Sequence, residues 1–198
     1  MSRQTVSSKT LKMVQLALFS AIIIIMSFVP YTGVISYGII SITTVHIPTI
    51  IGSIMLGTGG GAFLGALMGV CMLIRAWIMP GSPLEQIIFM NPLVSVLPRI
   101  IIGIVAALVF KGIMKLSHDK ASLSSGIAAL AGTLTNTVLV LTMMYSLYPD
   151  QLESTFGKTI GIIISTIFGL NGGIEIIAAI VVTIPIVNAL RRVNKKFR

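Results

Sequence analysis

Long apolar runs follow one another along almost the whole chain, separated by short polar segments. Such runs predict membrane helices, because a helix rises ~1.5 Å per residue and a hydrocarbon core of ~30 Å needs about 20 residues. The segment 159–168 is expected to form an apolar outer or re-entrant piece. The pattern predicts an all-α membrane protein, a bundle of six transmembrane helices at residues 11–29, 40–56, 60–79, 91–114, 122–145 and 171–190.

The composition favours a membrane protein over a soluble one. Of the 198 residues, 55% are hydrophobic and 10% are charged, and the mean hydropathy is +1.02. Too few polar side chains remain to cover a water-exposed surface, so residues 1–198 are expected to form a single integral membrane domain. The first apolar run follows basic residues as in a signal peptide, but no small-residue cleavage site follows it. We interpret it as the first helix.

The charges are distributed unevenly along the chain. Lysine and arginine number 14 and acidic residues 5, which gives a net charge of +9. Most basic residues lie near the chain ends or between the end of the fourth predicted helix and the loop after it, where anionic lipid headgroups attract them, so no nucleic-acid partner is expected. Because loops rich in lysine and arginine stay in the cytoplasm, both termini are predicted to be cytoplasmic.

Sequence motifs of enzymes are not found in this chain. It has no GxxxxGK[ST] phosphate loop and no HExxH zinc motif. Its single cysteine, Cys71, allows no disulfide framework and no CxxC metal site. We therefore expect no enzyme activity, no catalytic residue, no metal site and no cofactor in the chain itself.

Several polar side chains fall inside the apolar runs or at their ends. A charged group within hydrocarbon costs ~2.5–3.5 kcal/mol by insertion scales, so such side chains are candidates for a shared cavity. Counting residues from the helix ends places them in the half of the membrane opposite the termini. The candidate residues for binding a solute are Arg99, Asn91, Asn136, His46, Arg75, Glu175, Asn171 and Tyr37.

Two arginines and one glutamate would leave an excess of positive charge in this layer. The carboxylate of an anionic solute would pair with the surplus guanidinium group. Alternatively, Glu175 pairs with Arg99 or Arg75 only to hold the bundle together, and Arg75 extends to the membrane interface. His46 and Asn136 could likewise serve only as interhelical hydrogen-bonding groups.

Small residues recur at four-residue spacing in two places. Ala17 and Ala21 lie in the first predicted helix, and Gly57, Gly61, Gly65 and Gly69 lie at the start of the third and in the turn before it. This spacing puts a flat stripe on one helix face, which allows close contact with another helix. The stripe serves either internal packing or a partner protein.

Three stretches carry a resemblance to a known family. They are ALFSA at residues 17–21, TTVHIPTIIGS at 43–53 and NPLVSVLPRI at 91–100. In this order and spacing the chain resembles the substrate-binding S components of energy-coupling factor (ECF) vitamin transporters, over nearly its whole length. The TTVHIP stretch is most similar to the pantothenate branch.

The resemblance implies a high-affinity vitamin-binding subunit of an importer in the bacterial plasma membrane. Ala17 and Ala21 would dock on a transmembrane coupling protein, the T component, which carries two ATPase subunits that use ATP. The whole S component would topple in the membrane to release its vitamin, and residues 30–41 would form a lid. Alternative solutes are pyridoxine-like vitamins, riboflavin and folate. An alternative class is an ion-coupled permease that uses Glu175 and His46 as an ion relay.

Overall fold

The fold is described from a computed structural model, which describes residues 7–37, 40–118, 120–156 and 172–197. The predicted segment 159–168 and Asn171 lie outside these residues. The elements are α1 (Ser8–Phe28), β1 (Val34–Tyr37), β2 (Ile40–Thr43), α2 (His46–Ile78), α3 (Pro83–Phe89), α4 (Pro92–Leu116), α5 (Ala121–Leu147), α6 (Pro149–Phe156) and α8 (Gly173–Phe197). Among the described residues, five helices are long and apolar enough to cross a membrane: α1, α2, α4, α5 and α8. The predicted helical membrane architecture is confirmed.

Helix α2 consists of two limbs that meet at Gly57. This glycine has φ 81° and ψ −173°, a conformation that favours glycine because it has no Cβ. The limbs then run side by side: the Thr49 hydroxyl lies 3.5 Å from the sulfur of Met68. The first limb, residues 46–56, is about 16 Å long, roughly half the thickness of a hydrocarbon core. The count of six spans therefore stays a prediction.

The predicted start of a helix at residue 40 is wrong. Residues 40–43 form strand β2, which pairs antiparallel with β1 so that Val34 faces Thr43. The sequence Ile-Ser-Ile-Thr alternates apolar and polar residues, which is the period of a strand. The helix begins only at His46, after this hairpin.

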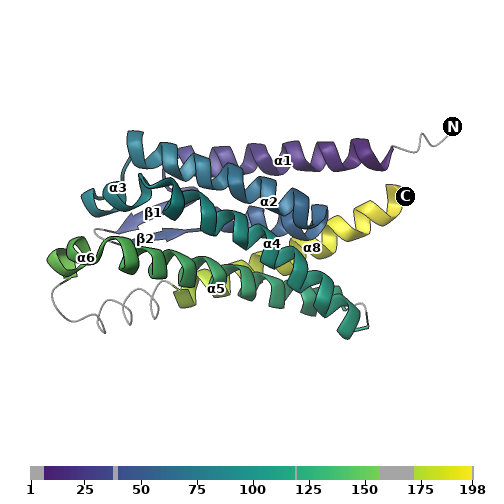
Figure 1. Ribbon diagram of the computed structural model, residues 1–198. Helices are drawn as coiled ribbons and strands as arrows, with labels where there is room; N and C mark the ends of the chain where they lie inside the picture. Colours follow the sequence, from purple (N-terminus) through teal and green to yellow (C-terminus); the bar gives the residue numbers. More distant parts are fainter. Residues whose placement is uncertain (1–6, 38–39, 119, 157–171, 198) are drawn as a thin grey trace.

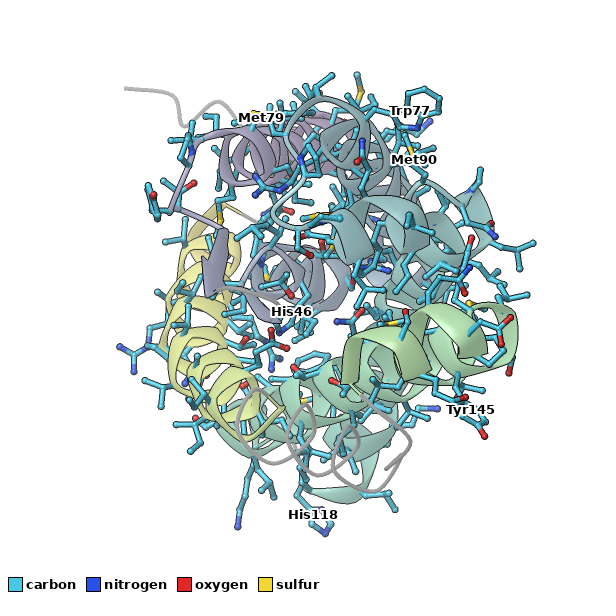
Figure 2. The ribbon with its side chains drawn as sticks, turned by 90° about the vertical axis from the view of Figure 1, so that its left-hand side faces the viewer. His46, Trp77, Met79, Met90, His118 and Tyr145 are labelled. Atoms are coloured by element: carbon cyan, nitrogen blue, oxygen red, sulfur yellow. The ribbon has the colours of Figure 1, made fainter. Side chains whose placement is uncertain are left out.

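The two ends of the bundle differ in what they contain. The β1–β2 hairpin, α3 and α6 lie at one end, and both chain termini lie at the other (Figure 1). Figure 2 looks along the bundle from the hairpin end, with the first limb of α2 and His46 near the middle and other helices around them. The assignment of the terminal end to the cytoplasm stays a prediction.

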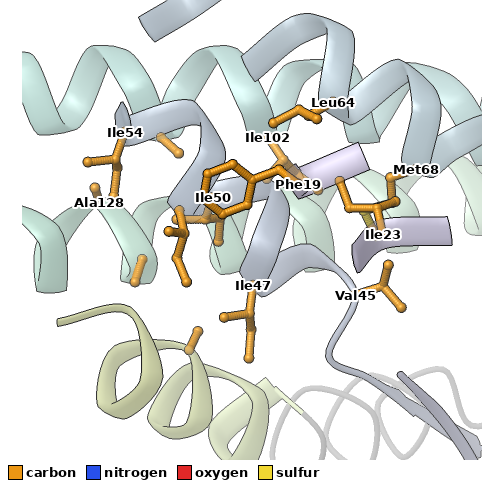
Figure 3. Packing of buried hydrophobic residues seen from close by; sticks show 14 of the residues in the cluster. Phe19, Ile23, Val45, Ile47, Ile50, Ile54, Leu64, Met68, Ile102 and Ala128 are labelled. Atoms are coloured by element: carbon orange, nitrogen blue, oxygen red, sulfur yellow. The ribbon is translucent and has the colours of Figure 1, made fainter. Parts of the chain in front are cut away.

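A hydrophobic core joins α1, both limbs of α2, α4 and α5. Buried side chains from these elements pack together, among them Phe19, Ile50, Leu64, Ile102 and Ala128 (Figure 3). The backbones of the second limb and α4 also touch. A Cβ atom on Gly61, Gly65 or Gly69 would overlap the α4 backbone near Gly103, Arg99 or Val96, respectively. This glycine stripe therefore serves internal packing, and it sets the position of α4 along the axis of the second limb of α2.

Candidate substrate-binding site

His46 opens the first limb of α2 and is fully buried. Neither ring nitrogen has a hydrogen-bond partner of normal geometry among the described residues, although the Thr43 backbone lies near the ring. Ile50, one turn further along the limb, packs against Gly132 of α5. Because the limb and α5 run in opposite directions, His46 lies at the level of Asn136, one turn beyond Gly132.

Asn136 and Thr133 bring two more buried polar groups into this layer. Asn136 is 7% exposed and Thr133 is fully buried. The amide oxygen of Asn136 and the hydroxyl oxygen of Thr133 have no hydrogen-bond partner among the described residues. Each unsatisfied buried group costs about 1–3 kcal/mol. A solute with hydroxyl or amide groups would satisfy these atoms.

Arg99 lies inside the bundle, with 4% of its surface exposed. Its Nη1 donates to the backbone oxygen of Val94 at 2.7 Å, and its Cζ lies 5.1 Å from the centre of the Phe89 ring. Its Nε has no partner in the described part of the chain. Arg99 is also close enough to His46 and Glu175 to interact electrostatically with both. A guanidinium group with unused donors therefore belongs to the same layer.

Glu175 ties α8 to the hairpin. It lies in the first turn of α8, and its Oε1 accepts hydrogen bonds from the amide of Thr43 at 2.6 Å and from the Thr43 hydroxyl at 3.2 Å. The position suits a carboxylate, because the N-terminal end of a helix carries partial positive charge. Within the described residues these bonds, rather than a bond to a guanidinium, hold Glu175. The structural pairing of Glu175 with an arginine stays a prediction, because Glu175 still interacts electrostatically with Arg99.

Arg75 occupies a different place from Arg99. It is 7% exposed, and its Nη1 donates to the backbone oxygen of Ser27 at 3.2 Å, so it connects α2 to the end of α1. This contact with Ser27 differs from the contacts of Arg99 with Val94 and Phe89, and the extension of Arg75 to the membrane interface stays a prediction. The Nε of Arg75, like that of Arg99, has no partner among the described residues. The electrostatic interactions with His46 and Glu175 distinguish Arg99, and the case for an anionic solute depends on them together with its free Nε.

Asn91 has two structural contacts at the start of α4. Its side-chain oxygen accepts from the Leu93 amide at 3.0 Å, which caps the helix, and its Nδ2 donates to the Tyr148 hydroxyl at 3.2 Å. Tyr37 lies in β1, but its side chain is outside the described structure, as is Asn171. Roles of these three residues in binding stay predictions.

Two residues of this layer were not selected as candidates from the sequence. Thr133 lies about one turn before Asn136 on the same predicted helix, and that spacing was a usable signal. Phe89 gave no such signal, because only the folded chain brings the end of α3 beneath Arg99. Within the described ranges, no group of three or more histidine, cysteine or acidic side chains could hold a metal ion.

Helix α1 presents an apolar face that the described chain does not cover. Ala17 and Ala21, the small residues expected to meet a partner, are both exposed. Large apolar side chains surround them on the same helix and are at least 43% exposed: Met13, Val14, Leu18, Ile24 and Ile25. This face is available to lipid or to another membrane protein.

Comparisons with known proteins identify the family of this chain. Residues 11–187 match the family described as "ECF transporter, substrate-specific component". The "Pantothenic acid transporter PanT" of Lactococcus lactis subsp. cremoris is 35% identical, over 76% of this chain and 78% of its own length. The "Pantothenate transporter PanT" of Leuconostoc mesenteroides subsp. mesenteroides is 31% identical, over 88% and 92%. The chain is a multi-pass protein of the bacterial plasma membrane, and it belongs to the family of substrate-specific components of ECF transporters.

Proposed function

We propose that this chain binds pantothenate from outside the cell as the substrate-specific component of an ECF transporter. One observation carries the proposal: Arg99 is buried with unused donors in the same layer as unsatisfied atoms of His46, Asn136 and Thr133. The two relatives named above for pantothenate transport support the choice of solute.

The chemistry of pantothenate fits these groups. It carries one carboxylate, one amide and two hydroxyls on a small flexible skeleton. The carboxylate would accept charge-assisted hydrogen bonds from Arg99, which are stronger than neutral ones. The amide and hydroxyls would exchange hydrogen bonds with His46, Asn136 and Thr133, since imidazole, amide and hydroxyl groups can each donate or accept. Asn91, Arg75, Asn171 and Tyr37 would belong to the wider surroundings of the solute.

The energy for uptake would come from partner proteins. The exposed face of α1 with Ala17 and Ala21 would dock on the T component, and two ATPase subunits would use ATP on its behalf. The chain itself would need no cofactor. In this arrangement residues 1–198 form one domain with cytoplasmic termini, and the two limbs of α2 count as separate passes.

The hairpin is the candidate lid of the site. It precedes His46 directly, and the bond from Thr43 to Glu175 joins it to α8. Because lids over binding sites are usually loops held by few contacts, opening would require only the Thr43 bonds and nearby packing to change.

The test is to identify the small molecule that the purified chain carries and to measure its binding. Mass spectrometry of the copurified solute should give the mass of pantothenate, and calorimetry should give tight binding of pantothenate but not of riboflavin, pyridoxine or folate. A flavin or pteridine mass would overturn the choice of solute. Uptake that persists in cells without the ATPase partners would instead favour the ion-coupled permease.

A further inference from the structure

Arg99 directly follows Pro98 in α4, and both residues act on one carbonyl group. In a regular helix the amide of residue 98 donates to the carbonyl oxygen of Val94, four residues earlier. Proline has no amide hydrogen, so that bond cannot form. In the structure, Nη1 of Arg99 donates to this same oxygen at 2.7 Å. The carbonyl that the proline releases thus becomes the anchor of the guanidinium group.

The surroundings make this anchor a firm one. Val94 is fully buried. A released backbone carbonyl in a membrane protein needs another donor, because water is not present in the hydrocarbon region to replace the lost bond. Charge-assisted hydrogen bonds are also stronger than neutral ones. Breaking the hydrogen bond between the Arg99 guanidinium and the Val94 carbonyl is therefore costly.

Contacts from α3 hold the same guanidinium from a second direction. Its Cζ lies 5.1 Å from the centre of the Phe89 ring, within the range of a cation–π interaction. The hydroxyl of Ser95, on the first turns of α4, donates to the backbone oxygen of Phe89. Phe89 is consequently tied to the helix that carries Arg99, so the ring and the anchor carbonyl keep their relative places.

The anchored orientation leaves Nε of the guanidinium without a partner among the described residues. The group has five N–H donors in a planar fork. With Nη1 on Val94, the edge formed by Nε and Nη2 points elsewhere, and Nε has no partner among the described residues. This is the edge that pairs side-on with both oxygens of a carboxylate.

We propose that Pro98 is a positioning residue for solute recognition, which acts by releasing the Val94 carbonyl to orient Arg99. The inference rests on the proposed function in one respect: the anion that Arg99 receives is the carboxylate of pantothenate. Pro98 itself touches no solute in this account.

The first test compares two ligands and two proline variants of the full purified chain. Pro98→Ala restores the amide that competes for Val94, and Pro185→Ala is the matched control, since Pro185 also lies inside a helix but is exposed. The ligands are pantothenate and its neutral alcohol analogue, in which CH2OH replaces the carboxylate. Pro98→Ala should weaken pantothenate binding about tenfold and the analogue less than about twofold. Pro185→Ala should change neither.

The control outcomes separate positioning from general packing. Equal weakening of both ligands by Pro98→Ala would assign Pro98 a purely structural role and overturn the proposal, as would no weakening at all. In an Arg99→Ala background, Pro98→Ala should cause no further loss of pantothenate affinity, because its effect acts through the guanidinium. If Pro98→Ala reduced pantothenate affinity by the same factor in the Arg99→Ala background as in the wild type, the proposal would be contradicted.

A ligand-free measurement separates this inference from the proposed function. In protein labelled with ¹⁵N-arginine, the Arg99 side-chain signals, assigned with Arg99→Lys, should show slow rotation and slow hydrogen exchange. Pro98→Ala should speed both processes, and Pro185→Ala should leave them unchanged. Identical Arg99 signals in wild type and Pro98→Ala would overturn the positioning role. If the wild type does not bind pantothenate, the proposed function fails while these spectra still decide the role of Pro98.

Discussion

The contact between α2 and α4 changes its character along its length. Towards the terminal end, Gly61 and Gly103 bring the two backbones into contact, and the Ser53 hydroxyl beside Gly61 is satisfied because it donates to the Thr49 backbone oxygen. Towards the hairpin end, buried His46 and Arg99 retain polar atoms without partners in the described chain. The polar groups of the first region have partners within the protein, whereas His46 and Arg99 in the second region have polar atoms without partners in the described ranges. Under the proposed function, stability and recognition therefore depend on separate parts of the same interface.

The division has a physical cause. Close backbone contact between helices needs only small residues and gains dispersion energy without polar groups. A site for a polar solute must instead keep hydrogen-bonding groups unsatisfied until the solute arrives, which destabilises the unliganded protein. Confining these groups to one end limits that cost.

The largest effect is expected from Gly65→Val. Any Cβ at this position overlaps the backbone oxygen of Arg99, so α2 and α4 must separate. We expect a loss of about 3 kcal/mol or more in unfolding free energy, or no folded protein. Thermal unfolding in detergent measures it. Gly59→Ala is the control, because a Cβ at Gly59 meets no atom within 4 Å; equal stability of both variants would refute the close-packed region.

The next test replaces each of the two buried arginines by alanine in turn. Arg99→Ala should weaken pantothenate binding by about 2–5 kcal/mol and weaken binding of its neutral alcohol analogue less. Arg75→Ala should leave the affinity unchanged but lower stability by about 1 kcal/mol, because the hydrogen bond to the Ser27 oxygen is lost. Calorimetry and thermal unfolding measure the two effects. A matched loss of affinity in Arg75→Ala would place both arginines in one site.

A smaller effect separates the charge of Glu175 from its hydrogen bonds. Glu175→Gln keeps an oxygen that can accept from both donors of Thr43, but it removes a negative charge near Arg99. Pantothenate affinity should stay equal or rise by up to about 1 kcal/mol. Glu175→Leu should in addition free the hairpin, seen as faster hydrogen exchange at β2. A strong loss of affinity in the glutamine variant would show that the solute needs the carboxylate.

The smallest effect is expected from Thr133→Val. The two side chains have nearly the same shape, and the hydroxyl has no partner among the described residues, so the unliganded protein should be unchanged or up to about 1 kcal/mol more stable. Pantothenate affinity should fall by about 1 kcal/mol if the hydroxyl binds solute. A variant that is less stable but binds pantothenate with unchanged affinity would show that Thr133 has a packing role and does not bind the solute.

The sequence predicts the helices well because the membrane makes strong demands on composition. A run of apolar residues is a one-dimensional signal that does not depend on what packs beside it. The exception is the stretch 40–43, whose alternation of apolar and polar residues was hidden because the apolar run continues into α2. A period of two over only four residues is a weak signal beside an adjacent helix.

The site was predictable by depth but not by partner. Counting residues predicts one layer for His46, Arg99 and Asn136. In the structure Arg99 interacts electrostatically with His46, and Ile50, one turn after His46, packs against Gly132, one turn before Asn136. The partners of Arg75 and Glu175 could not be counted in this way, because Ser27 and Thr43 lie on other elements and their alignment depends on tilt and packing. The depth of a side chain along its helix can be counted from the sequence. The direction in which it points around the helix axis, and its neighbours, depend on how the helices pack.

The reversal at Gly57 has a consequence for biosynthesis. The limb that follows the hairpin is about half as long as a hydrocarbon core is thick, and the chain that surrounds it, α4, α5 and α8, is synthesised afterwards. The ribosome therefore delivers the His46 end before its enclosure exists. Under the proposed function, the solute site is complete only after the last helix has joined the bundle, so truncated nascent chains should lack it even when their earlier helices are inserted.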